Sequence, residues 1–224
     1  MILIFLTNHA ELAGEPNGTF STELTHALHV FEEAGFAYQL ASIQGGAAPV
    51  YGQNAEDKVD TAVHADPVFQ KAIQNTKPAA ELKAEDYSAV FYPGGYGVLF
   101  DLAKHEGAAA ITARIYEAGG VVGAVCHGPA GLLPVTLSDG RSLLEGRTVT
   151  SFTRAEEVAF NTLDKIPYVL EDALLAKAAR FIRAENWAEN VAVAERVVTG
   201  QNPASAGAVA EAMVAAIRQP AGQP

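Results

Sequence analysis

GAVCHGPAGLL, residues 123–133, contains Cys126, the only cysteine in the chain. The apolar residues before the thiol are typical of a buried strand, and the HGP segment after it predicts a turn into a short helix that ends near Pro134. Gly123 and Gly128 flank the thiol and permit a sharp bend between strand and helix. This pattern is typical of a nucleophile elbow, which raises a reactive side chain at the carboxyl end of a sheet.

A thiol at such a turn is expected to act as a nucleophile. The N-terminus of the following helix stabilises negative charge, which predicts a Cys126 pKa below its ordinary value of about 8.5. The amide of His127 would point at an oxyanion formed on a substrate. A lone cysteine is often no more than a small buried hydrophobic side chain. Here the adjacent histidine and the flanking glycines favour the reactive role.

Strand-like and helical patterns alternate along the rest of the chain. Strands are predicted at residues 2–6, 36–42, 89–95, 121–125 and 148–151, with two more within 190–200 that turn at Glu195 and Arg196. Helices are predicted at residues 21–35, where Gly35 closes the helix, at 66–75, 107–118 and 166–179, and on the surface from Pro203 to Ile217. This alternation predicts an α/β protein whose mostly parallel sheet is covered by helices on both faces. Sites in such sheets form at the carboxyl ends of the strands.

Composition limits the classes of function. With 224 residues, 49% of them hydrophobic and 18% charged, residues 1–224 are expected to form one globular domain. The formal net charge of −11 disfavours binding to nucleic acids or anionic membranes. The apolar start lacks the basic residues of a signal peptide, no apolar run approaches the length of about 18 residues that a membrane helix needs, and one cysteine allows no internal disulfide. A cytoplasmic protein is expected.

The sequence predicts neither a metal nor a cofactor. His9 with Glu11, and His105 with Glu106, lack the spacing and the further ligands of a zinc site. The chain also contains no P-loop and no dinucleotide-binding fingerprint.

A carboxylate interrupts the apolar stripe of the first predicted helix. Glu23 lies three residues after Phe20 and four before Ala27, within a stripe that also contains Leu24, Leu28 and Phe31. If the side chain turns inward, burial raises its pKa, and a protonated glutamate beside a thiol suits acid/base chemistry at a carbonyl. A glutamate at the edge of the stripe that reaches water fits the same spacing.

Three further motifs are weaker evidence for a functional site. PGGYG at residues 93–97 follows a strand and offers amides for an oxyanion, although most Gly-Gly turns are only turns. Glu156 and Glu157 follow another predicted strand, and either one could orient His127 or simply begin a helix. TGQNPASAG at residues 199–207 predicts a turn and a helix start with Ser205 as a possible cap.

Together these motifs resemble the ThiJ/PfpI superfamily, the class I glutamine-amidotransferase-like fold. The resemblance is carried by AVCHGPAGL, DYSAVFYPGG, VTSFTRAEE and TGQNPASA, and it covers nearly the whole chain in order. Within the superfamily the chain is similar to the branch of chaperone-like, glutathione-independent glyoxalases (glyoxalase III). This resemblance implies a flavodoxin-like three-layer sandwich.

The resemblance also implies roles for individual residues. Cys126 matches the family's nucleophile and His127 the histidine that follows it. Glu157 matches the acid that holds this histidine, and Glu23 matches a helix glutamate that hydrogen-bonds the thiol. Gly95 would supply an oxyanion amide beside that of His127.

Two segments depart from the family pattern at the expected mouth of the pocket. Tyr96 stands where the branch has histidine in PGGHG, so it becomes a candidate for substrate binding. Residues 48–57 read APVYGQNAED, where relatives have a Pro-Asp-Pro-x-Ser-like segment.

The expected function is cofactor-independent conversion of a small 2-oxoaldehyde, such as methylglyoxal, into a 2-hydroxy acid through a Cys126 hemithioacetal. Three alternatives stay open at this point: an amidase or peptidase that uses the same cysteine, a holdase chaperone, and a redox sensor based on an exposed thiol of low pKa. The resemblance further implies a homodimer.

Overall fold

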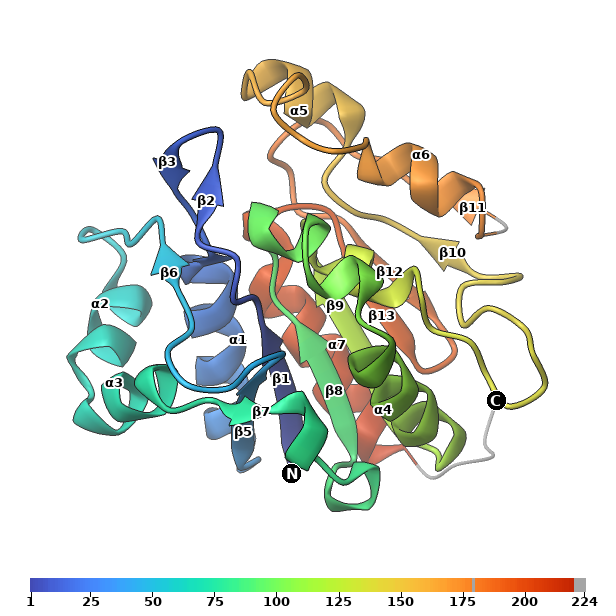
Figure 1. The fold of residues 1–224 in the computed structure, drawn as a ribbon, viewed down its shortest axis with the longest axis horizontal. Coiled ribbons are helices and arrows are strands. Elements are labelled where there is room, and N and C mark those ends of the chain that lie inside the picture. Colours follow the sequence, from blue (N-terminus) through green and yellow to red (C-terminus); the bar gives the residue numbers. More distant parts are fainter. Residues whose placement is uncertain (179, 220–224) are drawn as a thin grey trace.

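A twisted sheet forms the centre of the molecule (Figure 1). The structure is a computed structural model and describes residues 1–178 and 180–219. Within these residues seven strands pair in the order β12-β13-β9-β8-β1-β5-β7, and every pair is parallel except β12 with β13. The strands are β1 (Ile2–Leu6), β5 (Tyr38–Ser42), β7 (Lys77–Pro78), β8 (Ala89–Tyr92), β9 (Val121–Val125), β12 (Val191–Ala194) and β13 (Val197–Gly200). The predicted α/β class with a mostly parallel sheet is confirmed.

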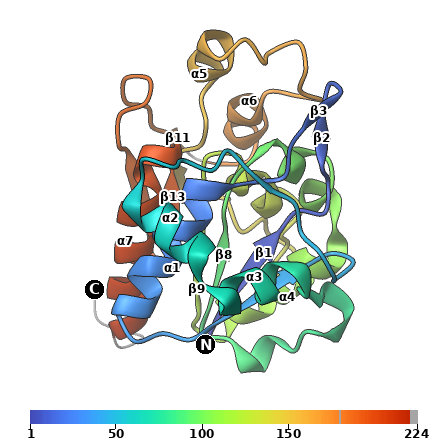
Figure 2. The same ribbon diagram turned by 90° about the vertical axis from the view of Figure 1, so that its left-hand side faces the viewer.

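Helices cover both faces of this sheet, as Figure 2 shows from the side. The first strand demonstrates the division, because Ile2, Ile4 and Leu6 pack into one core cluster while Leu3 and Phe5 pack into the other. Helices α1 (Ser21–Glu33), α3 (Pro67–Gln74) and α7 (Ala206–Arg218) contribute to the first cluster, and α4 (Glu106–Glu117) and α6 (Leu170–Leu175) to the second. Alternate side chains of a strand point to opposite faces, so a sheet that is covered twice needs apolar residues throughout.

The order β5-β1-β8-β9-β13 reverses direction at β1. Chains that leave neighbouring strands toward opposite faces open a crevice at the carboxyl ends. Helix α1 follows β1 through the short strand β4 (Thr19–Phe20), and the glycine loop follows β8. Both segments therefore begin at the edge where β9 ends and Cys126 follows.

Several predicted elements differ in extent. The helix expected at 166–179 is limited to α6, and its predicted end at Ala179 lies outside the described residues. The strand expected at 148–151 is β10 (Thr148–Val149), which pairs with β11 (Arg180–Phe181) outside the main sheet. The short helix after the cysteine is a 3-10 helix (Gly128–Leu132).

The C-terminal helix is half buried, which corrects the expected surface helix. Val209, Ala210, Met213 and Val214 of α7 face the sheet and α1, and an alanine-rich sequence allows this close approach. Ser205 precedes the helix, but its hydroxyl donates to Asn202 Oδ1 at 3.2 Å and makes no capping bond to α7.

Helix α2 (Lys58–Ala65) was not predicted, because only one of its residues is buried. That residue is Asp60, whose carboxylate accepts hydrogen bonds from the Ser21 hydroxyl at 2.6 Å, the Thr25 hydroxyl at 2.8 Å and the Asn54 amide at 2.7 Å. These bonds attach the segment from β6 (Val50–Tyr51) through α2 to the first turns of α1.

The remaining elements are short. They are strands β2 (Glu11–Leu12) and β3 (Glu15–Pro16), helix α5 (Arg154–Ala159), and 3-10 turns at Ala79–Glu81, Ala84–Asp86, Tyr96–Leu99, Leu102–Lys104 and Pro203–Ser205. None of the helices in the described ranges has the length and apolar character required to cross a membrane.

Candidate active site

The turn at Cys126 has the strained backbone of a nucleophile elbow. Cys126 has φ +60°, a left-handed conformation that side chains other than glycine rarely adopt. The strain is held from both sides, because the Cys126 amide donates to Gly200 O and its carbonyl accepts from the Phe152 amide, each at 2.9 Å. Gly128 allows the turn to close, since a Cβ there would lie 2.0 Å from Tyr92 O. Strained residues persist where the surrounding structure fixes them, and they cluster at active sites.

A chain of hydrogen bonds leads from the thiol to a carboxylate. His127 Nδ1 lies 3.3 Å from Cys126 Sγ, and His127 Nε2 lies 2.7 Å from Glu157 Oε1. All three residues are buried. Burial acts to raise the Glu157 pKa, but the hydrogen bond and charge of His127, with a further bond from Thr162, outweigh it and lower the pKa below the ordinary value. An ionised Glu157 holds the proton on Nε2, which leaves Nδ1 to accept a proton from the thiol.

The neighbouring glutamate has a structural task. Glu156 forms a capping box with Thr153, and its Oε1 accepts from the Trp187 amide at 3.0 Å and from Asn202 Nδ2 at 2.9 Å. Of the two glutamates that the sequence left open, Glu157 faces His127, whereas Glu156 fastens residues 187 and 202 to the start of α5.

Tyr96 faces the histidine and the carboxylate. Its ring centroid lies 4.3 Å from that of His127, and its hydroxyl lies 3.2 Å from Glu157 Oε2 and 2.9 Å from Thr162 Oγ1. Thr162 Oγ1 itself donates to Glu157 Oε2 at 2.5 Å. The hydroxyl of Tyr96 is thus turned away from the position expected for a substrate-binding group, although the residue lines the cavity. No motif in the sequence indicated Thr162.

Tyr96→Phe is expected to shift the acid limb of the pH–rate profile upward. The substitution removes a donor that favours the ionised form of Glu157, so the Glu157 pKa rises and activity is lost at a higher pH than in the parent. The fall in kcat at the optimum should stay below about tenfold, because Thr162 still donates. A profile of kcat/KM between pH 4 and 8 measures the shift, and an unchanged acid limb would contradict the link from Tyr96 to Glu157.

Glu23 is fully buried beside the thiol. Its Oε2 accepts from the Gly94 amide at 2.6 Å, while Oε1 has no well-aligned hydrogen-bond donor in the part of the chain that the structure describes. Burial raises the pKa of Glu23 to about 8, against smaller effects of the Cys126 thiol and the Gly94 amide, which lower it. The carboxyl group is therefore protonated at neutral pH and faces the cavity with a proton that it can give away.

The thiol itself is neutral in the resting chain. Burial raises the pKa of Cys126 well above its ordinary value, helped by Glu23, through its charge at the alkaline pH where it ionises and through its hydrogen bond, and then by the charges of Glu157 and Glu156. The lowered pKa expected from a helix N-terminus is wrong, because the five-residue 3-10 helix aligns few peptide dipoles and the carboxylates lie closer. A buried thiol of raised pKa also disfavours redox sensing by an exposed thiolate.

Gly94 lies between the three groups. A Cβ there would lie 2.4 Å from Glu23 Oε2 and 2.8 Å from both Cys126 Cβ and His127 N. Gly95 has φ +104°, and a Cβ on it would lie 2.1 Å from Gly18 O. The glycine loop therefore approaches the elbow more closely than any other residue type allows.

Gly94→Ala is expected to destabilise the fold by about 1–3 kcal/mol and to reduce turnover strongly, because the methyl group displaces Glu23 from the thiol. Denaturant unfolding and steady-state kinetics measure the two effects. Gly207→Ala is the control, since a Cβ at this position meets no atom within 4 Å. Parental activity in Gly94→Ala would show that this spacing is not needed.

The thiol opens into a cavity of about 350 Å³. Besides Cys126, His127 and Glu23, its walls are mainly aromatic and come from distant segments: Phe20, Tyr51, Tyr96, Phe152, Phe160 and Trp187. Apart from Tyr96, no pattern in the sequence indicated that these residues line a cavity. Trp187, the only tryptophan, was the one available signal.

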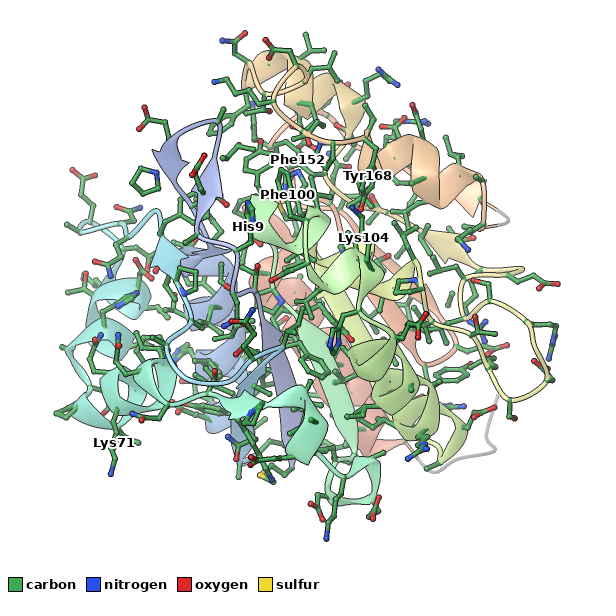
Figure 3. All side chains as sticks on the ribbon, in the orientation of Figure 1. His9, Lys71, Phe100, Lys104, Phe152 and Tyr168 are labelled. Carbon is green, nitrogen blue, oxygen red and sulfur yellow. The ribbon has the colours of Figure 1, made fainter. Side chains whose placement is uncertain are left out.

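The histidines outside this cavity have other contacts. His9 stacks on Phe100 with ring centroids 4.3 Å apart, and Figure 3 shows the two beside each other. His105 Nδ1 accepts from the Ala108 amide at 3.0 Å and so caps α4. Across residues 1–178 and 180–219, no three His, Cys, Asp or Glu side chains are grouped so as to hold a metal ion.

Known proteins resemble this chain over nearly its whole length. The model of the DJ-1/PfpI family matches residues 15–216. The chain is 33% identical to Glyoxalase 3 of Candida albicans over 96% of this chain and 97% of that protein. It is 31% identical to the glutathione-independent glyoxalase HSP31 of Saccharomyces cerevisiae over 97% of this chain and 98% of that protein.

Solved structures give the same grouping. Glyoxalase III from Candida albicans superposes with a TM-score of 0.85 at 30% identity, covering 96% of both chains. The 24 kDa rapid encystment protein of Francisella tularensis superposes with a TM-score of 0.93 at 27% identity, covering 97% of this chain and 99% of that one. The predicted resemblance is confirmed, and the chain belongs to the DJ-1/PfpI family.

Proposed function

We propose that this protein is a glutathione-independent glyoxalase that converts a 2-oxoaldehyde, such as methylglyoxal, into the 2-hydroxy acid. The observation that carries the proposal is the pairing of Cys126 with a histidine on one side and a protonated Glu23 on the other. Similarity to glyoxalases over nearly the whole chain supports the same activity.

Each group has a step to perform. His127 Nδ1 takes the thiol proton as Sγ attacks the aldehyde carbon, C1, and Glu23 protonates the aldehyde oxygen to give a hemithioacetal. The Glu23 carboxylate then removes the hydrogen of C1 as a proton, and the electron pair shifts toward the C2 oxygen, which takes the proton held by the His127 imidazolium to give an enediol. Glu23 returns its proton to C2 while the C1 hydroxyl gives its proton back to His127, which leaves a thioester. Water then cleaves the thioester to the hydroxy acid and the free thiol.

This sequence consumes one water and transfers electrons only within the substrate, so it requires no external oxidant. The amides of Gly95 and His127 would stabilise the oxygen that becomes negative, in a site that excludes bulk water. Glu157, through His127, stabilises the imidazolium that forms when the thiol is deprotonated.

Incubation of the purified chain with methylglyoxal, without glutathione, tests the proposal. Nuclear magnetic resonance should identify lactate, and in D2O part of the product should carry deuterium at C2 because the transferred proton passes through a side chain. Release of ammonia from amides without formation of lactate would instead assign the same residues to an amidase. The predicted homodimer stays a prediction, and the molar mass in solution tests it.

A further inference from the structure

Among the exposed large apolar side chains of the described residues, two line the catalytic cavity, and one of them lies in a short segment with two further exposed apolar residues. Val158, Phe160 and Leu163, which follow one another closely in and after α5, are 60%, 58% and 37% exposed, and Trp187 is 45% exposed. Phe160 and Trp187 also line the cavity, so this surface continues inward. Exposed apolar groups that continue into a pocket indicate what the pocket binds.

A series of aromatic rings leads from the catalytic histidine to the mouth of the cavity. The ring centroid of Phe152 lies 4.8 Å from that of His127 and 5.6 Å from that of Trp187. Phe160 continues the series at 5.9 Å from Trp187. Figure 3 shows Phe152 beneath α5 at the carboxyl edge of the sheet. The spacing of the rings matches that of interacting aromatic pairs.

Trp187, at the mouth of the cavity, has a strained backbone conformation. Trp187 has φ +68°, and its amide donates to the fully buried Glu156. The same carboxylate binds Asn202 and caps α5, which carries the chain on to Phe160. A bulky residue in a left-handed conformation that a buried carboxylate fixes is a built feature rather than a loose loop.

Apart from the polar groups of Thr22, Tyr51 and Asn54 and the catalytic residues, the described walls of the cavity are apolar, and they provide no lysine or arginine to pair with an anionic substituent. Glu23 is the only carboxylic acid among these described lining residues. The net charge of −11 also opposes the approach of phosphorylated or carboxylated aldehydes. A volume of about 350 Å³ leaves most of the cavity empty around a three-carbon substrate.

We infer that the preferred substrates are 2-oxoaldehydes with an aromatic substituent, arylglyoxals, whose ring binds among Phe152, Phe160 and Trp187 while the aldehyde carbon meets Cys126 Sγ. This inference rests on the proposed function and deepens it. The reaction is the one proposed above and needs no further reactant. Sγ adds to C1, the C1 hydrogen moves as a proton to the carbon that bears the ring, and water releases the hydroxy acid with its aromatic substituent.

The inference is tested by comparing the rates for three 2-oxoaldehydes that carry an aromatic ring, a saturated ring or a methyl group. We expect kcat/KM for phenylglyoxal to exceed that for methylglyoxal by at least about tenfold, because a buried apolar group contributes that much discrimination. It should exceed that for cyclohexylglyoxal by about two- to tenfold, because the saturated ring has a similar size but no aromatic face. The rate measured with Cys126→Ala is subtracted as background.

Variants at the mouth separate ring contacts from the chemistry. Trp187→Leu and Phe160→Leu are each expected to lower the ratio of kcat/KM for phenylglyoxal to that for methylglyoxal by about three- to tenfold. Val158→Ala is the matched control, since Val158 is as exposed as Phe160 but does not line the cavity, and it should leave this ratio unchanged.

The failures can be told apart. If none of the three aldehydes is converted, the proposed function fails. If methylglyoxal is converted but phenylglyoxal reacts no faster than methylglyoxal or cyclohexylglyoxal, the glyoxalase assignment stands and the aromatic preference is overturned.

Discussion

Cys126→Ala is expected to lower the turnover of methylglyoxal by at least about 10³-fold, because no hemithioacetal forms without the sulfur. Removal of Glu23 or His127 leaves a nucleophile in place, whereas this substitution removes the atom that bonds to the substrate. Lactate formation measured without glutathione gives the rate. A variant that converts methylglyoxal at the parental rate would refute the covalent scheme.

The controls for this prediction come from the backbone at Cys126. Its φ of +60° is strained for any side chain but costs glycine nothing, so Cys126→Gly should be more stable than Cys126→Ala by about 1 kcal/mol while both are inactive. Denaturant unfolding of the two variants separates loss of the fold from loss of the nucleophile. If both variants unfold at the same denaturant concentration, the elbow is not strained as described.

The position of the nucleophile was predictable from sequence because the signals are local. A strand, a lone thiol and two glycines occupy one short stretch, and this pattern is visible without the distant atoms that make the glycines necessary, Met213 Sδ at Gly123 and Tyr92 O at Gly128. The inward position of Glu23 followed from helical periodicity combined with the resemblance. Periodicity alone allowed the opposite answer, because a residue at the edge of a stripe can reach water.

The direction of the Cys126 pKa was not predictable in the same way. It depends on burial and on carboxylates from α1 and α5, whose distances no spacing in the sequence gives. The composition of the cavity wall was not predictable either, because it brings together residues from separate segments: Phe20, Tyr51, Phe160 and Trp187. Helix α2 was not predictable because its one buried residue is the polar Asp60. Hydrogen bonds to Asp60 come from Ser21, 39 residues away, and from Asn54 in the preceding loop.

Glu23→Gln is expected to reduce kcat by about 10²–10⁴-fold, which is the usual contribution of a positioned acid or base. Glutamine keeps the size of the side chain and can still accept from the Gly94 amide, so packing around the thiol is preserved. The amide neither gives nor takes a proton at neutral pH. Steady-state kinetics with methylglyoxal measures the loss, and unchanged kcat would remove Glu23 from the mechanism.

The same substitution is expected to raise stability at alkaline pH. The Glu23 pKa is 4.5 in an ordinary environment and about 8 in the folded chain, so between these values the folded state holds a proton that the unfolded state has released. The stability that this group contributes is therefore fully present below pH 4.5 and falls as pH rises toward 8. The loss from pH 5 to pH 8 amounts to about 3 kcal/mol at 1.36 kcal/mol per pH unit.

Glutamine has no such loss, so the unfolding free energy of Glu23→Gln minus that of the parent should grow by about 3 kcal/mol from pH 5 to pH 8. Denaturant unfolding at several pH values measures this difference, in which the other titrating groups cancel. Parallel curves for the two proteins would mean that Glu23 is ionised in the folded chain and cannot serve as the initial acid. A glutamate with a merely structural role would lower activity and stability together. Opposite changes in activity and in stability at pH 8 are expected only if the folded chain keeps a protonated carboxyl group beside the thiol for catalysis, despite its cost.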